Sequence, residues 1–185
     1  MRIVGGDLGG RVVRAPGGAA TRPTSEKVRE AMFGILNRLG SPMEGARVLD
    51  LFAGSGALGI EALSRGASHA TFVDFGKVPL GVIRGNLNDL GLEPRATVLG
   101  SDAVAAAARP VAQPFDFVFI DPPYASDLAT RASLALPAAN LAPEATIVIE
   151  HDRRHAPPER LGSLVRIDER RYGDTLVSFY QRGST

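Results

Sequence analysis

From residue 46 onward, short apolar segments alternate with segments of helical periodicity, and this alternation limits the chain to very few folds. Strands are expected over residues 47–52, 70–74, 97–99, 115–120 and 146–150, with helices near 57–65, 77–90, 102–108 and 127–136. Continuous apolar strands separated by helices are typical of a parallel sheet covered on both faces. The pattern therefore predicts an α/β, Rossmann-like, doubly wound fold.

The segments before and after this core also show patterns that predict secondary structure. Residues 164–171 and 175–181 are strand-like and predict an antiparallel hairpin at the sheet edge. A helix over residues 24–40 is expected to precede the core of residues 46–182. Residues 1–20 are glycine-rich with two short β-type runs, which predicts a small hairpin extension outside the main fold. We expect one domain over residues 1–185, and an extension that is dispensable for folding.

Composition narrows the class of protein. The 185 residues are 44% hydrophobic and 22% charged, with no cysteine and three histidines. Disulfides, thiolate metal sites and thiol catalysis are thus not available, and no apolar run approaches the roughly 20 residues of a membrane helix. We expect a cytoplasmic monomer without a metal. Arginines exceed acids near both ends of the chain, which permits contact with phosphates.

A glycine loop follows the first core strand. Gly54, Gly56 and Gly59 match G-x-G-x-x-G, and Asp74 ends the next strand 18 residues beyond Gly56. Glycines here let a backbone approach a ligand, and the acid can accept hydrogen bonds from both ribose hydroxyls. This pattern alone fits NAD as well as S-adenosylmethionine.

Two further acids favour S-adenosylmethionine. Asp50 precedes the glycines where a ligand ammonium would need an acceptor, and Asp102 follows the third strand, where an adenine amino group would lie. Helix capping is an alternative role for Asp102. The predicted cofactor-binding residues are Asp50, Phe52, Ala53, Gly54, Ser55, Gly56, Asp74, Phe75, Asp102 and Ala103.

An apolar strand then runs directly into Asp121-Pro122-Pro123-Tyr124. Proline fixes φ and holds the preceding residue extended, so the turn presents the Asp121 carboxylate and the Pro122 carbonyl as acceptors. Two acceptors suit the two N–H groups of an amine on a planar base. They would orient the nitrogen and stabilise the charge that develops on it, while Tyr124 would stack on the base. These four residues are the predicted catalytic set.

Residues 50–59 together with residues 121–124 resemble the amino-methyltransferases of Rossmann-like fold. The opening residues 1–6, the segment 21–24 and the segment 28–33 narrow the resemblance to the bacterial RsmD family, which modifies guanine N2 in 16S ribosomal RNA. The resemblance covers essentially the whole chain. It implies a seven-stranded methyltransferase fold, S-adenosylmethionine as donor, and 16S rRNA or a 30S particle as substrate.

The resemblance also implies that the segment 22–24 borders the cofactor or the RNA. With the N-terminal arginines, this gives the predicted substrate-binding set of Arg2, Arg11, Arg14, Arg22 and Thr24. One departure stands out: the family has a second acid two residues after the first, whereas Asp74 is followed by Phe75-Gly76. Phe75 is expected to pack beside the adenine.

Three other functions are open at this stage. An adenine-N6 methyltransferase acting on DNA or RNA uses the same Asp-Pro-Pro-Tyr turn, although the chain has little room for a DNA-recognition domain. An NAD-dependent oxidoreductase would explain the glycines and leave residues 121–124 without a role. A non-catalytic RNA-binding module would tolerate loss of Asp50 or Asp121, and both are present.

Overall fold

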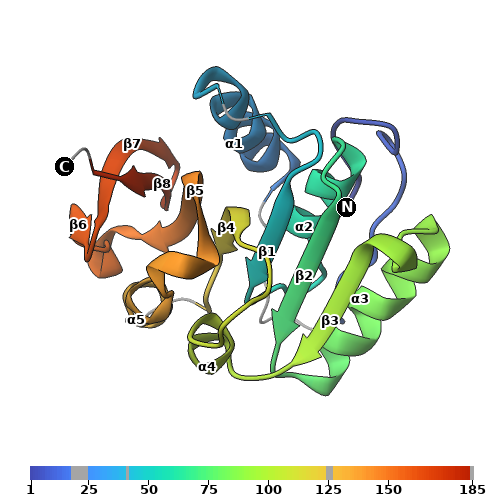
Figure 1. Cartoon of the computed structure of the whole chain (residues 1–185). Coiled ribbons are helices and arrows are strands. Elements are labelled where there is room, and N and C mark those ends of the chain that lie inside the picture. The colour runs from blue at the N-terminus through green and yellow to red at the C-terminus, as the bar shows by residue number, and fades with distance from the viewer. Residues whose placement is uncertain (18–24, 41, 124–126, 184–185) are drawn as a thin grey trace.

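The computed structural model describes residues 1–17, 25–40, 42–123 and 127–183, which form a sheet with helices on both faces (Figure 1). The strands are β1 (Arg47–Leu51), β2 (His69–Asp74), β3 (Ala96–Gly100), β4 (Phe115–Ile120), β5 (Leu141–Asp152), β6 (Arg160–Leu161), β7 (Leu164–Tyr172) and β8 (Thr175–Arg182). The helices are α1 (Glu26–Arg38), α2 (Ala57–Ser64), α3 (Lys77–Leu90), α4 (Ala103–Ala107) and α5 (Leu128–Ala135), with short 3₁₀ turns η1 (Glu93–Arg95), η2 (Ala138–Asn140) and η3 (Arg153–His155).

The eight strands lie in the order β3-β2-β1-β4-β5-β8-β7-β6, and β1 to β5 are parallel. β8 and β7 form the expected antiparallel hairpin beside β5, and the two-residue strand β6 adds to the seven expected strands. The Rossmann-like fold is confirmed. Strand β1 lies where the order reverses, with β2 on one side and β4 on the other, so ligands are expected at its carboxyl end.

Two cores flank the sheet. On one face, α1, α2 and α3 pack on side chains such as Phe72, Phe117 and Phe119. On the other face, α4 and α5 pack on Val118, Ile147 and their neighbours. Successive residues of a strand point alternately into the two cores, as expected for a strand that is buried on both faces. It explains why these strands read as continuous apolar runs.

The N-terminal segment lies outside the sheet but is part of the packed structure. A single antiparallel bridge joins Arg2 to Val12, and the side chains of Ile3 and Val13 are buried in the core beneath α1 to α3. Glu61 of α2 accepts hydrogen bonds from the backbone N–H groups of Val4 and Gly5, each at 2.8 Å. Removing the segment would expose apolar side chains and strip donors from a buried carboxylate. From these contacts we expect the chain to need this segment for stability, in contrast to the dispensability expected from the sequence.

None of the described helices is long and apolar enough to cross a membrane.

Candidate functional site

The carboxyl ends of β1, β2, β3 and β4 lie side by side along one edge of the sheet. Leu51 pairs with Val73 of β2 and with Ile120 of β4, and Asp74 pairs with Gly100 of β3. This register brings the glycine loop, Asp74, Asp102 and Asp121 to the same edge, as parallel strands require. Most of the predicted site therefore converges on one stretch of the described surface.

The glycine loop leaves β1 through an unusual backbone conformation. Phe52 has φ 60°, a value that residues other than glycine rarely adopt, and Gly54 and Gly56 follow with φ 57° and 78°. A Cβ added at Gly54 would meet only the carbonyl oxygen of Phe52, at 3.9 Å, so the backbone there is open to a ligand. The strained turn at Phe52 is of the kind found where the surrounding structure holds a functional loop in place.

Gly59 serves packing instead. A Cβ at this position would lie 2.3 Å from the ring of Phe72, so only glycine lets α2 approach β2 this closely.

Asp74 organises the loop with both of its carboxylate oxygens. Oδ2 accepts from Gly54 N–H and Oδ1 accepts from Gly76 N–H, both at 2.9 Å. Each carboxylate oxygen can accept more than one hydrogen bond, so these contacts leave capacity for ligand hydroxyls. Asp74 thus holds the glycine loop and presents a charged acceptor beside it.

Asp50 lies beneath the loop. Its side chain is buried, and Oδ2 accepts from Gly59 N–H at 2.9 Å, which anchors the first turn of α2 to β1. Burial is the main cause of a pKa of about 8 for this carboxyl; the Gly59 hydrogen bond lowers the pKa and the charge of Asp74 raises it, and both of these effects are smaller. Near neutral pH the group therefore holds a proton in the absence of a cation.

Asp102 and Phe75 lie at the next two strand ends. Asp102 is exposed and caps α4, because its Oδ1 accepts from Ala105 N–H at 2.8 Å. Capping, the alternative role considered for this residue, is thus observed. Ala103 is buried in the first turn of α4, and the Phe75 side chain is 82% exposed next to Asp74. An aromatic ring this exposed beside Asp74 is an available stacking surface.

Asp121 continues β4 into the proline turn. Its N–H lies 3.4 Å from the carbonyl oxygen of Leu51, the residue immediately before the glycine loop. Asp121 and Pro122 are half-buried and Pro123 is exposed. One backbone contact therefore links the strand that ends in the predicted catalytic turn to the strand that begins the predicted cofactor loop.

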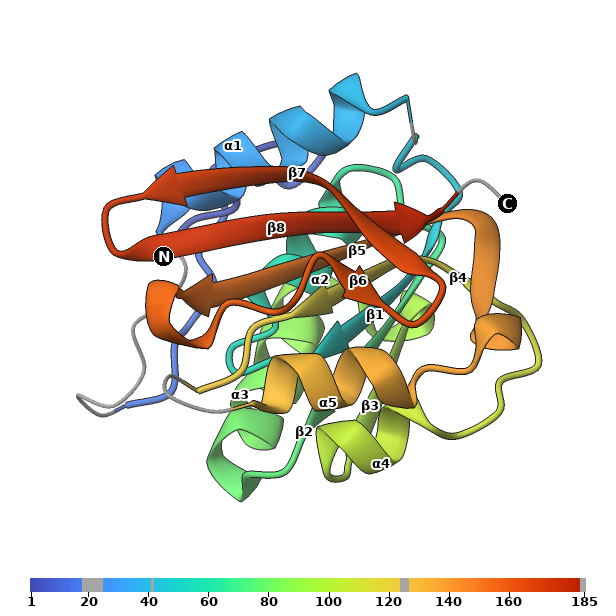
Figure 2. The same ribbon diagram turned by 90° about the vertical axis from the view of Figure 1, so that its left-hand side faces the viewer.

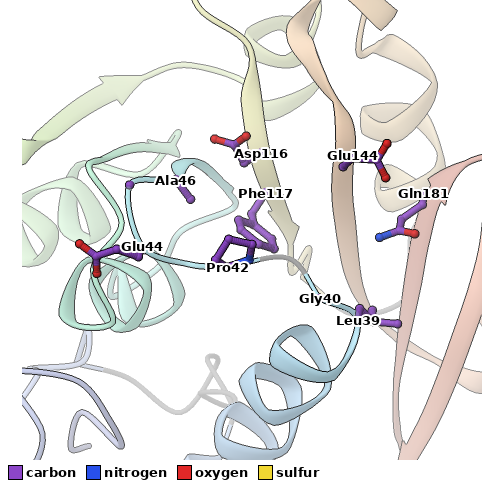
Figure 3. Close-up of a pocket in the computed structure, with 10 residues that line it drawn as sticks. Leu39, Gly40, Pro42, Glu44, Ala46, Asp116, Phe117, Glu144 and Gln181 are labelled. Atoms are coloured by element: carbon purple, nitrogen blue, oxygen red, sulfur yellow. The ribbon is translucent and has the colours of Figure 1, made fainter.

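A hollow of about 420 Å³ lies at the opposite edge of the sheet (Figure 3). Asp116 and Phe117 at the start of β4, Glu144 in β5 and Gln181 of β8 are among its lining residues. Asp116 accepts from the N–H of Arg47 at 2.8 Å, which ties together the starts of β1 and β4. None of the predicted site residues within the described ranges lines this hollow, which lies at the opposite ends of the strands from the glycine loop.

Comparisons with known proteins identify the family of this chain. A family model described as conserved hypothetical protein 95 matches residues 1–181. The chain belongs to this family, the RsmD family. The resemblance expected from the sequence is confirmed.

Several relatives in this family match nearly the full chain. A Bacillus subtilis (strain 168) protein, provisionally named as an rRNA methyltransferase, is 41% identical over 98% of this chain and 99% of its own. Ribosomal RNA small subunit methyltransferase D of Escherichia coli (strain K12) is 34% identical over 98% of this chain and 90% of its own. Among solved structures, an Escherichia coli protein provisionally named as a methyltransferase has a TM-score of 0.83 at 33% identity, covering 100% of this chain and 99% of that one.

The predicted substrate-binding arginines of this family member are engaged within the protein. Arg2 donates to the Gly10 carbonyl at 2.8 Å, and Arg11 donates to the Asp89 carbonyl at 3.0 Å. Arg14 forms an ion pair with the side chain of Asp89. All three lie on the packed N-terminal segment. The predictions for Arg22, Thr24 and Tyr124 concern residues outside the described part of the chain.

Sequence reasoning missed Asn86. This buried side chain on α3 accepts from Arg14 N–H at 2.9 Å and donates to the carbonyl oxygens of Arg14 and Ser55, at 2.9 and 3.0 Å. It therefore joins the N-terminal segment to the glycine loop. A polar residue among the apolar positions of a predicted helix was the available signal, since a buried amide needs partners.

In the described part of the chain, no group of three or more His, Cys, Asp or Glu residues is placed to hold a metal ion.

Proposed function

We propose that the protein transfers a methyl group from S-adenosylmethionine to the exocyclic N2 amine of a guanine in small-subunit ribosomal RNA. The observation that carries the proposal is the adjacency of the glycine loop and the Asp121-Pro122 turn at neighbouring strand ends, joined through Leu51. The names of the relatives support ribosomal RNA as the substrate class. The two acceptors of the turn support an amine as the target.

The residues present fit S-adenosylmethionine. The open backbone at Gly54 suits close approach of the cofactor, and Asp74 suits its ribose hydroxyls. Phe75 and Asp102 border the place where an adenine would lie, and Ala53, Ser55 and Ala103 are further proposed cofactor-binding residues. When bound, S-adenosylmethionine supplies an electrophilic methyl group on a sulfonium.

Asp50 takes a supporting place in this proposal. It holds α2 against β1 from beneath the loop, and its buried carboxyl would ionise when a cation, such as the ammonium of the cofactor, comes near. A nearby positive charge favours the carboxylate form and offsets the effect of burial on the pKa.

The acceptor half of the reaction belongs to the turn. The Asp121 carboxylate and the Pro122 carbonyl would each accept one N–H of the amine, which orients the nitrogen lone pair toward the methyl group. As the nitrogen becomes positive, the hydrogen bonds to these acceptors strengthen, so they favour the transition state over the ground state. Asp121 or water then receives the proton. Tyr124 is proposed to stack on the base, as the sequence predicts.

The test is incubation with labelled S-adenosylmethionine and either unmodified 16S rRNA or 30S particles, followed by nucleoside analysis. N2-methylguanosine supports the proposal, and N6-methyladenosine would identify the adenine-directed alternative. Comparing the two substrates decides whether the assembled particle is needed. Titration with NADH and with S-adenosylmethionine separates the oxidoreductase alternative, because only one of the two should bind.

A further inference from the structure

A second feature of the carboxyl edge is a hollow of about 440 Å³ between η3 and the β7–β8 hairpin. Its charged lining consists of three arginines and one glutamate: Arg153, Arg166, Arg171 and Glu169. Ala156 and Leu176 complete it. Figure 2 shows η3 and the β7–β8 turn at the same end of the sheet, the end toward which the β5 arrow points. Arg2, Arg11 and Arg14, the described members of the predicted substrate-binding set, are not among its lining residues.

Hydrogen bonds in η3 and strand pairing in β7 fix the positions of these arginines. Asp152 caps η3 by accepting from the N–H groups of Arg154 and His155 at 2.7 and 3.0 Å, which fixes the turn that carries Arg153. On β7, Glu169 and Arg171 lie on one face because strand residues two apart point the same way. Leu176 of β8 lies between His151 of β5 and Arg171 of β7, so it joins these two strands beside the hollow.

The hollow has an excess of positive charge. Oε2 of Glu169 accepts from the Ser178 hydroxyl at 2.8 Å and from Arg166 at 2.9 Å, so the charge of Glu169 is paired with that of Arg166. Arg171 is anchored by one bond from Nε to the Gly173 carbonyl at 2.8 Å. Among the residues that the structure describes, neither Arg153 nor Arg171 has a carboxylate partner. His151 behind the hollow adds no charge near neutral pH, because burial lowers its pKa.

This hollow lies within reach of the predicted catalytic turn. Ile120 of β4 pairs with Ile149 of β5, Glu150 pairs with Val177 of β8, and Val177 pairs with Arg170 of β7. Asp121 is thus level with Arg170, three strand spacings away, which is about 14 Å. Arg171 lies one residue further along β7, toward the carboxyl edge of the sheet. A few nucleotides of an extended strand span this distance.

We propose that the hollow lined by Arg153 and Arg171 binds a backbone phosphate of the RNA strand that flanks the target nucleotide. This inference rests on the proposed function, because it is the RNA-binding counterpart of the Asp121 turn. Guanidinium groups match phosphate oxygens with paired N–H donors, and phosphate contacts fix the register of a nucleic acid without reading its sequence. The RNA then crosses the ends of β4, β5, β8 and β7.

The experiment compares full-length Arg153→Ala/Arg171→Ala with a control of equal charge, Arg38→Ala/Arg170→Ala. Arg38 is exposed at the end of α1, and Arg170 points away from the hollow and pairs with Asp168 at 3.0 Å. Affinity for a labelled, mixed-sequence, single-stranded RNA is measured by anisotropy between about 50 and 200 mM salt. The hollow variant should bind about tenfold more weakly, with a salt slope shallower by about 0.7 for the lost phosphate. The control should match wild type.

Parallel titration with S-adenosylmethionine separates failure of this inference from failure of the proposed function. Wild-type protein that binds neither S-adenosylmethionine nor the RNA overturns the proposed function, and this inference with it. If wild type binds both and the hollow variant keeps the wild-type affinity and slope for RNA, the inference alone is wrong. Reduced turnover on 30S particles with unchanged RNA affinity also overturns it, and indicates a protein contact instead.

Discussion

The two halves of the carboxyl edge are built differently. In the half formed by β1, β2 and β3, each acid already accepts a backbone N–H: Asp50 from Gly59, Asp74 from Gly54 and Gly76, and Asp102 from Ala105. In the half formed by β4, β5, β8 and β7, the edge presents the Asp-Pro-Pro turn and a hollow lined by arginines. The first half is organised by its own backbone, whereas the second carries the residues that we propose to hold the target amine and the RNA.

The difference teaches what a substitution should cost in each half. In the β1–β3 half, removing an acid strips a partner from backbone donors, so loop order and cofactor affinity should fall together. In the β4–β7 half, removing a group should cost turnover or RNA binding with little loss of stability. Substitutions at four positions test this comparison.

Asp121→Ala should give the largest effect. Loss of an electrostatic acceptor that acts in the transition state lowers kcat by about 100- to 1,000-fold, by analogy with removal of an oxyanion-hole donor. Affinity for S-adenosylmethionine should stay within about tenfold of wild type. Single-turnover kinetics and a cofactor titration measure the two quantities. Turnover near the wild-type rate would show that the turn does not hold the target amine.

Asp74→Ala should lower both cofactor affinity and the stability of the glycine loop. Hydrogen bonds to charged groups are worth about 1.5–3 kcal/mol, so the Kd for S-adenosylmethionine should rise by about ten- to a hundredfold. The melting temperature should fall too, because the N–H groups of Gly54 and Gly76 lose their acceptor. Calorimetric titration and thermal unfolding check the pair of effects. A lower melting temperature with an unchanged Kd would confine Asp74 to holding the loop.

Much of this contrast could be predicted from the local sequence, and part of it could not. The β1–α2 loop and the β4 turn were predictable because glycine and proline impose their conformations on neighbouring residues. The full length of β5 was not, because Pro143 and Glu144 interrupt its apolar run, and the pairing with β4 shifts register between Phe115 and Phe117.

Long-range partners are the main part of the site that local sequence does not reveal. Arg11 and Arg14 were predicted as RNA contacts from their charge alone, and their contacts with Asp89 form only because α3 packs against the N-terminal segment. Asn86 was missed for the same reason, since its partners Arg14 and Ser55 lie far away along the chain. The arginine hollow likewise joins η3 to β7 only after β8 has paired with both β5 and β7.

Asp50→Asn tests the buried acid of the first half through pH. The folded pKa of about 8 lies above the unfolded value near 3.9, so the protonated group contributes stability that is full below about pH 4 and is lost as pH rises through about 8. Asparagine does not titrate in this range and still accepts from Gly59. The variant should therefore gain stability relative to wild type as pH rises from 5 to about 8. Urea unfolding midpoints measure the difference.

The same variant decides whether Asp50 meets the cofactor ammonium. If it does, the wild-type Kd for S-adenosylmethionine should fall by up to about tenfold between pH 6 and 7, because ammonium binding requires the carboxylate. This interval lies below the usual titration of an α-amino group, near 7.7–8.0. Asp50→Asn should then bind weakly with a flat pH profile. If the Kd of the two proteins changes with pH in the same way, Asp50 serves only to anchor α2.

The smallest effect is expected at Asp102, where capping and ligand binding compete as explanations. Alanine removes the N-cap bond to Ala105, which costs about 1 kcal/mol of stability. Serine restores the cap without the charge. If the carboxylate also accepts from the adenine amine, Asp102→Ser should recover the melting temperature of wild type while its Kd for S-adenosylmethionine stays about fivefold higher, since a charge-assisted hydrogen bond at an exposed site is worth about 1 kcal/mol. If capping is its sole role, serine restores both quantities together, and the first half of the edge then binds its cofactor with one acid fewer than the sequence predicts.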